Sequence, residues 1–198
     1  MQEFVQQGKP AVAVRPNGPL AMKINIKLIV RRFFMPRPVV SIYYYLKYRA
    51  RVSHRAEVEL SPTIKLGRNV TISSFGKFKA TSGSITIGDG SGFATSAFVT
   101  SSDKGVRIGK NCIFGSHVVI VDSSYSYSRI DIPYKEQPIV SKGIEIGDNV
   151  FVGSNVTIAD GSQIGDNCVI VANSFVNRRF PPNCIIQGSP AKIIQKRQ

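Results

Sequence analysis

The chain has 198 residues, which is enough for one domain with its own hydrophobic core and a short appendage. Its hydrophobic share of 42% is ordinary for a folded domain, so the composition excludes a disordered chain and a bundle of membrane helices. The net charge is +14, and 17 glycines, 11 prolines and no tryptophan favour strands and turns over helices.

The positive charge is concentrated in the first 56 residues. This stretch holds eleven Lys and Arg against one acid, Glu3, whereas the rest of the chain carries a net charge of only +4. No recognised nucleic-acid motif accompanies the charge, which argues against a nucleic-acid partner. We therefore expect a basic arm joined to a nearly neutral body.

The first segment, residues 1–21, is predicted to be a loose leader. It lacks the sustained apolar core of a signal peptide, and Met22 is an alternative start to Met1. The three cysteines of the chain are too few and too dispersed for a disulfide framework. These features predict a cytoplasmic protein.

The second segment, residues 22–56, interleaves bases with bulky apolar and aromatic residues. We expect it to be partly helical, with two short helices broken at Pro36 and Pro38. Its longest charge-free apolar run is far below the roughly 18–20 residues that span a bilayer. Two interpretations of residues 22–55 stay open: the arm caps one end of the next domain, or it lies on the anionic inner face of a membrane.

The third segment, residues 57–198, has a period of six. From residue 60 onward, an apolar residue followed by a small one recurs in hexads, and six consecutive hexads keep one phase. Earlier blocks keep the spacing in other phases, with phase breaks at 79–86, 100–107 and 121–145. The residues predicted to point inward are Leu60, Leu66, Ile72, Ile87, Phe93, Val99, Ile108, Phe114, Ile120, Ile146, Val152, Ile158, Ile164, Ile170 and Val176.

A period of six fits a solenoid of triangular coils. A strand of about four residues and a two-residue corner make one side, and three sides close a coil whose inward residues stack about 4.8 Å apart. Cys112 and Cys168 both stand four positions after an inward Ile, where a small buried residue suits. The predicted corners are Gly67-Arg68-Asn69, Gly109-Lys110-Asn111, Gly147-Asp148-Asn149 and Gly165-Asp166-Asn167.

The longest phase break is the first place to look for an active site. Residues 121–145 are too many for a corner and too polar and aromatic for a strand, so we expect a protruding loop near 121–143. A long loop on a rigid scaffold is more often functional than decorative.

Three segments, 144–170, PPN at 181–183 and GSPAKII at 188–194, resemble the hexapeptide-repeat acyltransferases, in particular sugar O-acetyltransferases of the galactoside, maltose and capsular-polysaccharide type. The resemblance covers roughly residues 60–195. It implies an all-β, left-handed parallel β-helix that forms a homotrimer with active sites between subunits. It also implies transfer of acetyl from acetyl-CoA to a sugar hydroxyl in polysaccharide or surface-glycan biosynthesis, with a histidine as general base.

The resemblance also implies the acetyl-CoA contacts. Phe151 stands where the family often has Trp, and Lys192 matches a base that faces the CoA phosphates. For the basic members, a solvated surface is the alternative interpretation. The implied set is Phe151, Gly153, Ser154, Ala172, Asn177, Arg178 and Lys192. No metal is implied, and two histidines are too few for the three-histidine zinc site of γ-type carbonic anhydrases, which share the solenoid.

The catalytic side departs from the family pattern. Tyr125 stands where the general-base histidine is expected, and phenols ionise only near pH 10. Asp122 is ionised at neutral pH but too weakly basic. His117, at a corner of the preceding hexad, is either a displaced base or an exposed corner residue, and His54 is expected to be structural.

Three functions stay open at this point. The leading hypothesis is the O-acetyltransferase, in which Tyr125 orients the acceptor. A second is a catalytically impaired solenoid that serves as an assembly or regulatory partner, and a third is a slow acyltransferase with an amine acceptor. The identity of the saccharide cannot be derived from a motif, because loop shape sets it.

Overall fold

The computed structural model describes residues 36–197. The predicted leader and residues 22–35 of the arm lie outside the described residues. No helix within 36–197 combines the length and the hydrophobicity needed to cross a bilayer.

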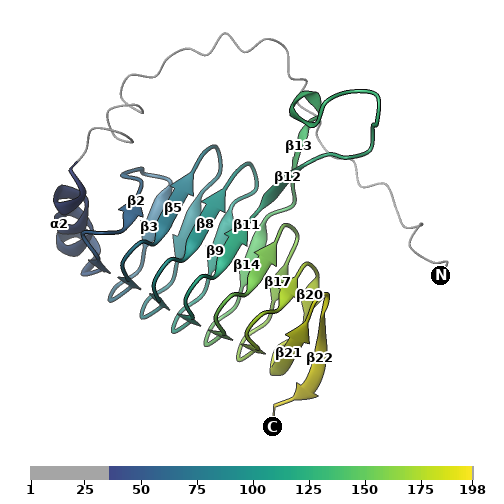
Figure 1. The fold of residues 1–198 in the computed structure, drawn as a ribbon. Helices are drawn as coiled ribbons and strands as arrows, with labels where there is room; N and C mark the ends of the chain where they lie inside the picture. Colours follow the sequence, from purple (N-terminus) through teal and green to yellow (C-terminus); the bar gives the residue numbers. More distant parts are fainter. Residues whose placement is uncertain (1–35, 198) are drawn as a thin grey trace.

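The chain winds through three parallel sheets in turn, so that each coil places one strand on each of three faces (Figure 1). We call these sheets faces A, B and C. Face A contains β1 (Arg51–Val52), β4 (Thr71–Ile72), β7 (Gly92–Phe93), β10 (Ile113–Phe114), β15 (Phe151–Val152), β18 (Val169–Ile170) and β21 (Cys184–Gly188). Face B contains β2 (Glu57–Val58), β5 (Lys77–Ala80), β8 (Phe98–Ser101), β11 (Val119–Val121), β16 (Thr157–Ala159) and β19 (Phe175–Val176). Face C contains β3 (Ile64–Leu66), β6 (Ile85–Ile87), β9 (Val106–Ile108), β14 (Ile144–Ile146), β17 (Gln163–Ile164) and β20 (Arg179–Phe180).

The core is the column of inward side chains from the three faces. All the residues predicted to point inward are buried, except Leu60, which is partly buried and packs against the core. Strand pairing keeps equivalent residues in register, as Phe93 on β7 pairs with Phe114 on β10. Their rings stack with centroids 4.3 Å apart, and Phe78 meets Phe93 edge-on at 5.0 Å. The sixfold period therefore predicted the core correctly.

The corners between faces C and A confirm the Gly-x-Asn prediction; we call this corner the asparagine edge. Asn69, Asn111, Asn149 and Asn167 all have φ between 55° and 58°, in the left-handed region that Asn tolerates. Their side chains continue the stack, since Asn149 Nδ2 donates to Asn167 Oδ1 at 2.8 Å. Glycine starts each corner because the coils touch there, and a Cβ on Gly109 would collide with the backbone of Gly147.

The three phase breaks all fall between faces B and C. The extra residues lie between β5 and β6, between β8 and β9, and between β11 and β14. Because added length is confined to one edge, the other two edges keep their stacking. We call the corner between faces B and C the hairpin edge, and the corner between faces A and B the histidine edge.

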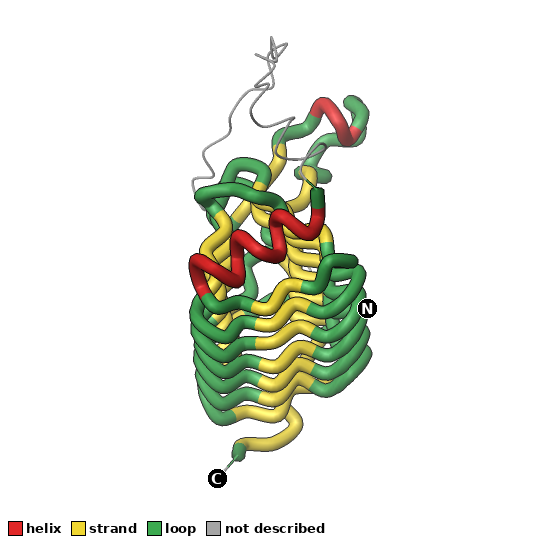
Figure 2. The backbone as a smooth tube through the Cα atoms, turned by 90° about the vertical axis from the view of Figure 1, so that its left-hand side faces the viewer, coloured by secondary structure: helices red, strands yellow, loops and turns green. Residues whose placement is uncertain are grey.

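A helix closes the N-terminal end of the solenoid. Helix α2 (Arg37–Tyr48) lies across the first coil (Figure 2). Tyr44 is fully buried, and its hydroxyl donates to the Glu59 carbonyl at 3.0 Å. The sequence left open whether the arm caps the solenoid or lies on a membrane. The inner side of α2 packs on the first coil and caps the solenoid. Strand β1 already belongs to face A, although the sequence analysis places the start of the repeat segment at residue 57.

The predicted helix break at Pro38 is wrong. Pro36 is the N-cap of α2, and Pro38 lies in the first turn of the helix. A proline there interrupts nothing, because the first N–H groups of a helix have no intrahelical partner.

Candidate functional site

The long insertion is a hairpin. Strands β12 (Ser123–Tyr125) and β13 (Ile139–Ser141) pair antiparallel, and a 3₁₀ turn at Tyr134–Glu136 lies near the tip. The hairpin projects from the solenoid at the hairpin edge (Figure 1). The expectation that this segment contains no strand is wrong at its two ends, because backbone pairing does not require apolar side chains.

The distal part of the hairpin holds its own shape. The Gln137 side chain is buried and joins both backbone groups of Arg129: its Nε2 donates to the carbonyl at 2.8 Å, and its Oε1 accepts from the amide at 3.3 Å. Arg129 also forms an ion pair with Asp131. The distal part of the hairpin is thus held in a defined conformation by its own contacts.

Asp122 fixes the first root of the hairpin to the preceding coil. Its side chain is fully buried, and Oδ1 accepts from the Ser102 amide at 2.7 Å. Oδ2 accepts from the Gly105 amide at 3.0 Å and from Ser101 Oγ at 3.4 Å. Burial raises the pKa of Asp122, although these hydrogen bonds oppose the rise. Both carboxylate oxygens accept hydrogen bonds, so Asp122 stabilises the turn formed by residues 101–105 of the preceding coil.

Asp160 fixes the second root. Its Oδ1 accepts from the amides of Lys142 at 2.6 Å and Gly143 at 3.0 Å. Val121 pairs with Ala159, so Asp122 and Asp160 occupy the same place on consecutive coils. Sequence analysis missed Asp160; the signal was the repeated aspartate after the face B strand.

We predict that Asp122→Asn destabilises the fold by about 1–3 kcal/mol at pH 7, because an amide NH₂ would oppose a buried backbone N–H. Since the folded pKa of Asp122 is raised, the wild-type carboxyl gains a proton in the folded chain at a higher pH than in the unfolded chain. The extra stability that this proton brings is therefore complete below pH ~4 and is lost as the pH rises through the folded pKa, whereas the hydrogen bonds of the carboxylate remain at pH 7. Denaturant melts at several pH values should show the gap between wild type and variant widening as the pH falls. A constant or shrinking gap would contradict the assignment.

Tyr125 ends the first strand of the hairpin. It pairs with Ile139, and its side chain is 47% exposed. Its hydroxyl has no hydrogen-bond partner among residues 36–197. The phenol is thus exposed and free to form hydrogen bonds outside this chain.

The two histidines lie elsewhere. His117 is exposed at the histidine edge, with φ 59°, stacked between Ser96 and Asn155 in corners of the same kind. The strand β11 separates it from the hairpin by about 10 Å of extended chain. His54 is exposed at the same edge in the first coil. Within one chain, the structure does not bring either histidine to Tyr125.

The acetyl-CoA candidates divide into two groups. Gly153, Ser154 and Ala172 lie at the histidine edge, where a Cβ on Gly153 would collide with the Ala172 backbone. Phe151 is exposed on face A beside this edge, and Lys192 lies on β22 (Ala191–Lys196), antiparallel to β21. Asn177 and Arg178, by contrast, form the last corner of the hairpin edge.

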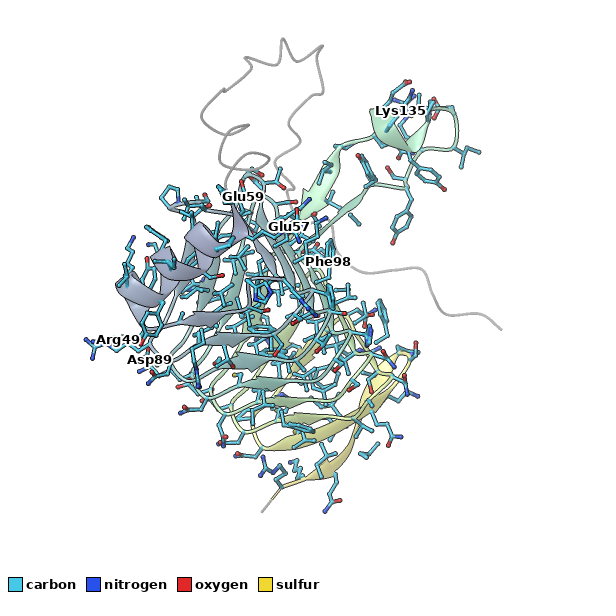
Figure 3. All side chains as sticks on the ribbon, turned by 60° about the vertical axis from the view of Figure 1, so that its left-hand side comes forward. Arg49, Glu57, Glu59, Asp89, Phe98 and Lys135 are labelled. Atoms are coloured by element: carbon cyan, nitrogen blue, oxygen red, sulfur yellow. The ribbon has the colours of Figure 1, made fainter. Side chains whose placement is uncertain are left out.

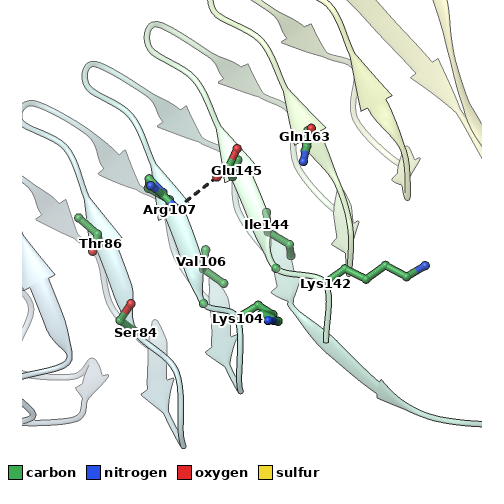
Figure 4. A pocket seen from close by; sticks show the side chains of 11 residues that line it. Ser84, Thr86, Lys104, Val106, Arg107, Lys142, Ile144, Glu145 and Gln163 are labelled. Carbon is green, nitrogen blue, oxygen red and sulfur yellow. Dashed lines mark ion pairs between the residues drawn. The ribbon is translucent and has the colours of Figure 1, made fainter. Parts of the chain in front are cut away.

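A groove that sequence analysis did not predict runs along face C and includes Lys142 and Gly143 at the second root of the hairpin (Figure 4). Its volume is about 480 Å³, and Lys104 and Lys142 stand at one end of it on neighbouring coils. Arg107 and Glu145 line its wall as an exposed ion pair at 3.2 Å. These residues come from separate coils, so no local sequence motif could have predicted the groove.

The cysteines have no part in the site. Cys112 and Cys168 are fully buried, as predicted, and the thiol of Cys184 is buried and free too. Within the part of the chain that the structure describes, no group of three His, Cys, Asp or Glu could hold a metal ion.

Comparison with known proteins identifies the repeat. Residues 143–178 match the family model described as bacterial transferase hexapeptide (six repeats). This part of the chain carries a hexapeptide repeat. The "Probable acetyltransferase Rv3034c" of Mycobacterium tuberculosis is 27% identical over 145 residues, which are 72% of this chain and 48% of that protein. The chain thus spans about half the length of this curated relative.

Solved structures show the same fold. AntD, an N-acyltransferase from Bacillus cereus in complex with dTDP and 3-hydroxybutyryl-CoA, matches with a TM-score of 0.68 at 18% identity, over 79% of this chain and 87% of that chain. A mutant GDP-perosamine N-acetyl transferase from Caulobacter crescentus, in complex with CoA and GDP-perosamine, matches with a TM-score of 0.52 at 20% identity, over 71% and 56%. The predicted left-handed parallel β-helix is thereby confirmed.

Proposed function

We propose that the protein is a CoA-dependent acyltransferase that acetylates a sugar hydroxyl. The observation that carries the proposal is the hairpin. The solenoid interrupts its stack at one corner and fixes both roots of the hairpin with carboxylates, of which Asp122 is buried. The hairpin presents Tyr125, whose hydroxyl has no partner among residues 36–197, and Lys142 at its second root lines the groove on face C. The relatives named above support it, since they are an acetyltransferase and two acyltransferases bound to CoA or acyl-CoA.

The chemistry is a direct transfer. The acceptor oxygen attacks the thioester carbonyl carbon, the C–S bond breaks, and the hydroxyl proton goes to the CoA thiolate, giving an ester and free CoA. No covalent acyl-enzyme is needed. Tyr125 donates to or accepts from the acceptor hydroxyl and so orients it, which lowers the barrier by positioning more than by proton transfer.

The complete site needs a second copy of the chain. Tyr125, Asn177 and Arg178 lie at the hairpin edge, whereas His117, Gly153 and Ser154 lie at the histidine edge across face B. A homotrimer would bring the hairpin of one copy to the histidine edge of the next. The hairpin carries apolar side chains that this chain leaves in solvent, Tyr127 at 80% and Ile130 at 102% exposure, and burial against a neighbour would stabilise them.

The groove on face C suits an acceptor with a negatively charged group. Lys104 and Lys142 are exposed at its end, and ammonium groups bind phosphate as point charges. AntD and the perosamine enzyme were solved with dTDP and GDP-perosamine, respectively, which supports a nucleotide-linked sugar as acceptor. A role in polysaccharide or surface-glycan biosynthesis follows from the same proposal.

Acetyl-CoA binding tests the donor half. We expect calorimetry to show binding that Arg178→Ala plus Lys192→Ala weakens about a hundredfold or more, because each lost charged hydrogen bond to phosphate costs roughly 1.5–3 kcal/mol. Lys110→Ala, an exposed cation at the asparagine edge, is the matched control and should bind as wild type does. Absence of binding by the wild-type chain would favour the non-catalytic solenoid.

An amine acceptor is the second candidate. The observation that favours it is that neither histidine of the described residues lies at the hairpin edge, since an amine needs less help from a base than a hydroxyl does. Transfer assays with matched hydroxyl and amino sugar nucleotides decide between them. Faster transfer to the amino sugar would assign N-acylation.

A further inference from the structure

Helix α2 is apolar on both sides. Val40 and Tyr44 face the solenoid and are buried. On the outer side, Ile42 is 58% and Leu46 is 75% exposed. A helix that covers the end of a domain normally presents charged residues to water, so a second apolar stripe indicates a second contact. The exposed apolar residues of this outer stripe are Val39, Ile42, Tyr43, Tyr45 and Leu46.

The helix and the residues that follow it carry only positive charges. The segment 36–56 contains five cations and no acid. The nearest acid along the chain, Glu57, is paired with Lys77 at 3.1 Å. Arg49 reaches away from the solenoid beyond the end of α2 (Figure 3). The five cations are Arg37, Lys47, Arg49, Arg51 and Arg55.

The tyrosines join the apolar and the charged parts. Lys47 Nζ lies 5.3 Å from the centre of the Tyr43 ring and receives no acid partner; it donates to the Tyr43 hydroxyl at 2.9 Å. Arg49 lies 6.0 Å from the Tyr45 ring centre. Beside them, Ile42, Tyr45 and Arg51 line a hollow of about 320 Å³. Rings with a polar rim and long cationic side chains above an apolar stripe are typical of a membrane interface.

The apolar stripe and the cations together indicate which kind of partner binds this side of α2. A second copy of this end would set five cations against five cations, and a nucleic acid would leave Ile42 and Leu46 in water. An anionic lipid surface satisfies both, because headgroups pair with the bases while acyl chains cover the stripe. We propose that the outer face of α2 is a docking surface for an anionic membrane. The preceding residues 22–35, with four more bases among apolar residues, continue the same composition towards α2.

Sedimentation of the full chain with vesicles of phosphatidylcholine and phosphatidylglycerol tests the proposal. Ile42→Glu plus Leu46→Glu should lower the partition coefficient roughly a hundredfold, through lost apolar burial and added repulsion. Arg37→Gln, Lys47→Gln and Arg49→Gln together should lower it by a similar factor, about fivefold for each cation, on anionic vesicles only. The control Ile194→Glu adds one charge at an apolar residue that is 56% exposed on β22, at the other end of the solenoid, and should bind as wild type does.

Each outcome bears on the proposal. Unchanged circular dichroism and melting of the variants would show that α2 still caps the solenoid. If the α2 variants bind vesicles as wild type does, residues 1–35 alone carry the attraction and the proposal fails. It also fails if tRNA competes the vesicles off while the stripe variants keep full affinity for tRNA and vesicles. Acyl transfer in solution is measured separately, so the proposed function and the docking surface can fail independently.

Discussion

Replacing Tyr125 with histidine is expected to raise kcat for transfer to a sugar hydroxyl by about a hundredfold, the lower range for a placed general base. The position is half exposed at the end of β12, and both roots of its hairpin are held by carboxylates, the buried Asp122 and the partly buried Asp160. An imidazole there would keep its location while gaining the ability to take a proton near neutral pH. Release of free thiol from acetyl-CoA, with the acceptor saturating, measures the effect.

The control for this prediction is His117→Ala, at the histidine edge. If Tyr125→His has no effect while His117→Ala abolishes transfer, the base has moved to the histidine edge and acts across a subunit boundary. If neither variant changes a measurable rate with an amino sugar, the acceptor is an amine. If Tyr125→His restores nothing and acetyl-CoA does not bind, the impaired solenoid is the better description.

Phe93→Ala is expected to lower the free energy of unfolding by about 3–5 kcal/mol. Phe93 is the middle ring of a column, stacked on Phe114 and edge-on to Phe78, and almost none of it is exposed. Coils joined through register-matched strands cannot move inward to fill the gap. Chemical denaturation at fixed protein concentration gives the value, since an oligomer makes the apparent stability depend on concentration.

Phe75→Ala provides the comparison, because Phe75 is exposed at a corner. Its removal should change the free energy of unfolding by less than about 1 kcal/mol. Equal losses in the two variants would mean that the ring column does not hold the coils together.

The repeat could be predicted from the sequence because it is local. Every sixth position from Ile146 to Val176 carries an inward apolar residue, and each coil repeats the demand, so periodicity alone locates the core. The Gly-x-Asn corners could also be predicted from the sequence, since few residues accept the left-handed backbone that Asn149 and Asn167 adopt. Even the phase breaks had structural meaning, because all of them lie at the hairpin edge.

The parts that escaped prediction depend on contacts between coils. Asp122 was considered for catalysis because of its place before Tyr125, whereas its amide partners lie on the coil before it. The partner of Asp160, the Lys142 amide, lies on the preceding coil. Lys104 and Lys142 line one groove only because their coils stack. The outer stripe of α2 was visible as composition, but the side of the helix that packs on the solenoid could not be read from residues alone. The roles of Tyr125, His117 and the acetyl-CoA set remain predictions.

Stacked coils leave a problem at each end, because the last turn exposes a row of unpaired backbone groups that would accept another chain. The final strand meets it by reversing direction: β22 runs antiparallel along β21, so an incoming parallel coil finds the wrong polarity on face A. At the other end, α2 lies over the first coil and offers no strand edge at all. Both ends of face A are therefore closed to a further parallel coil, one by a strand of opposite direction and the other by a helix. On that face, a geometry that could otherwise grow into a fibre is blocked.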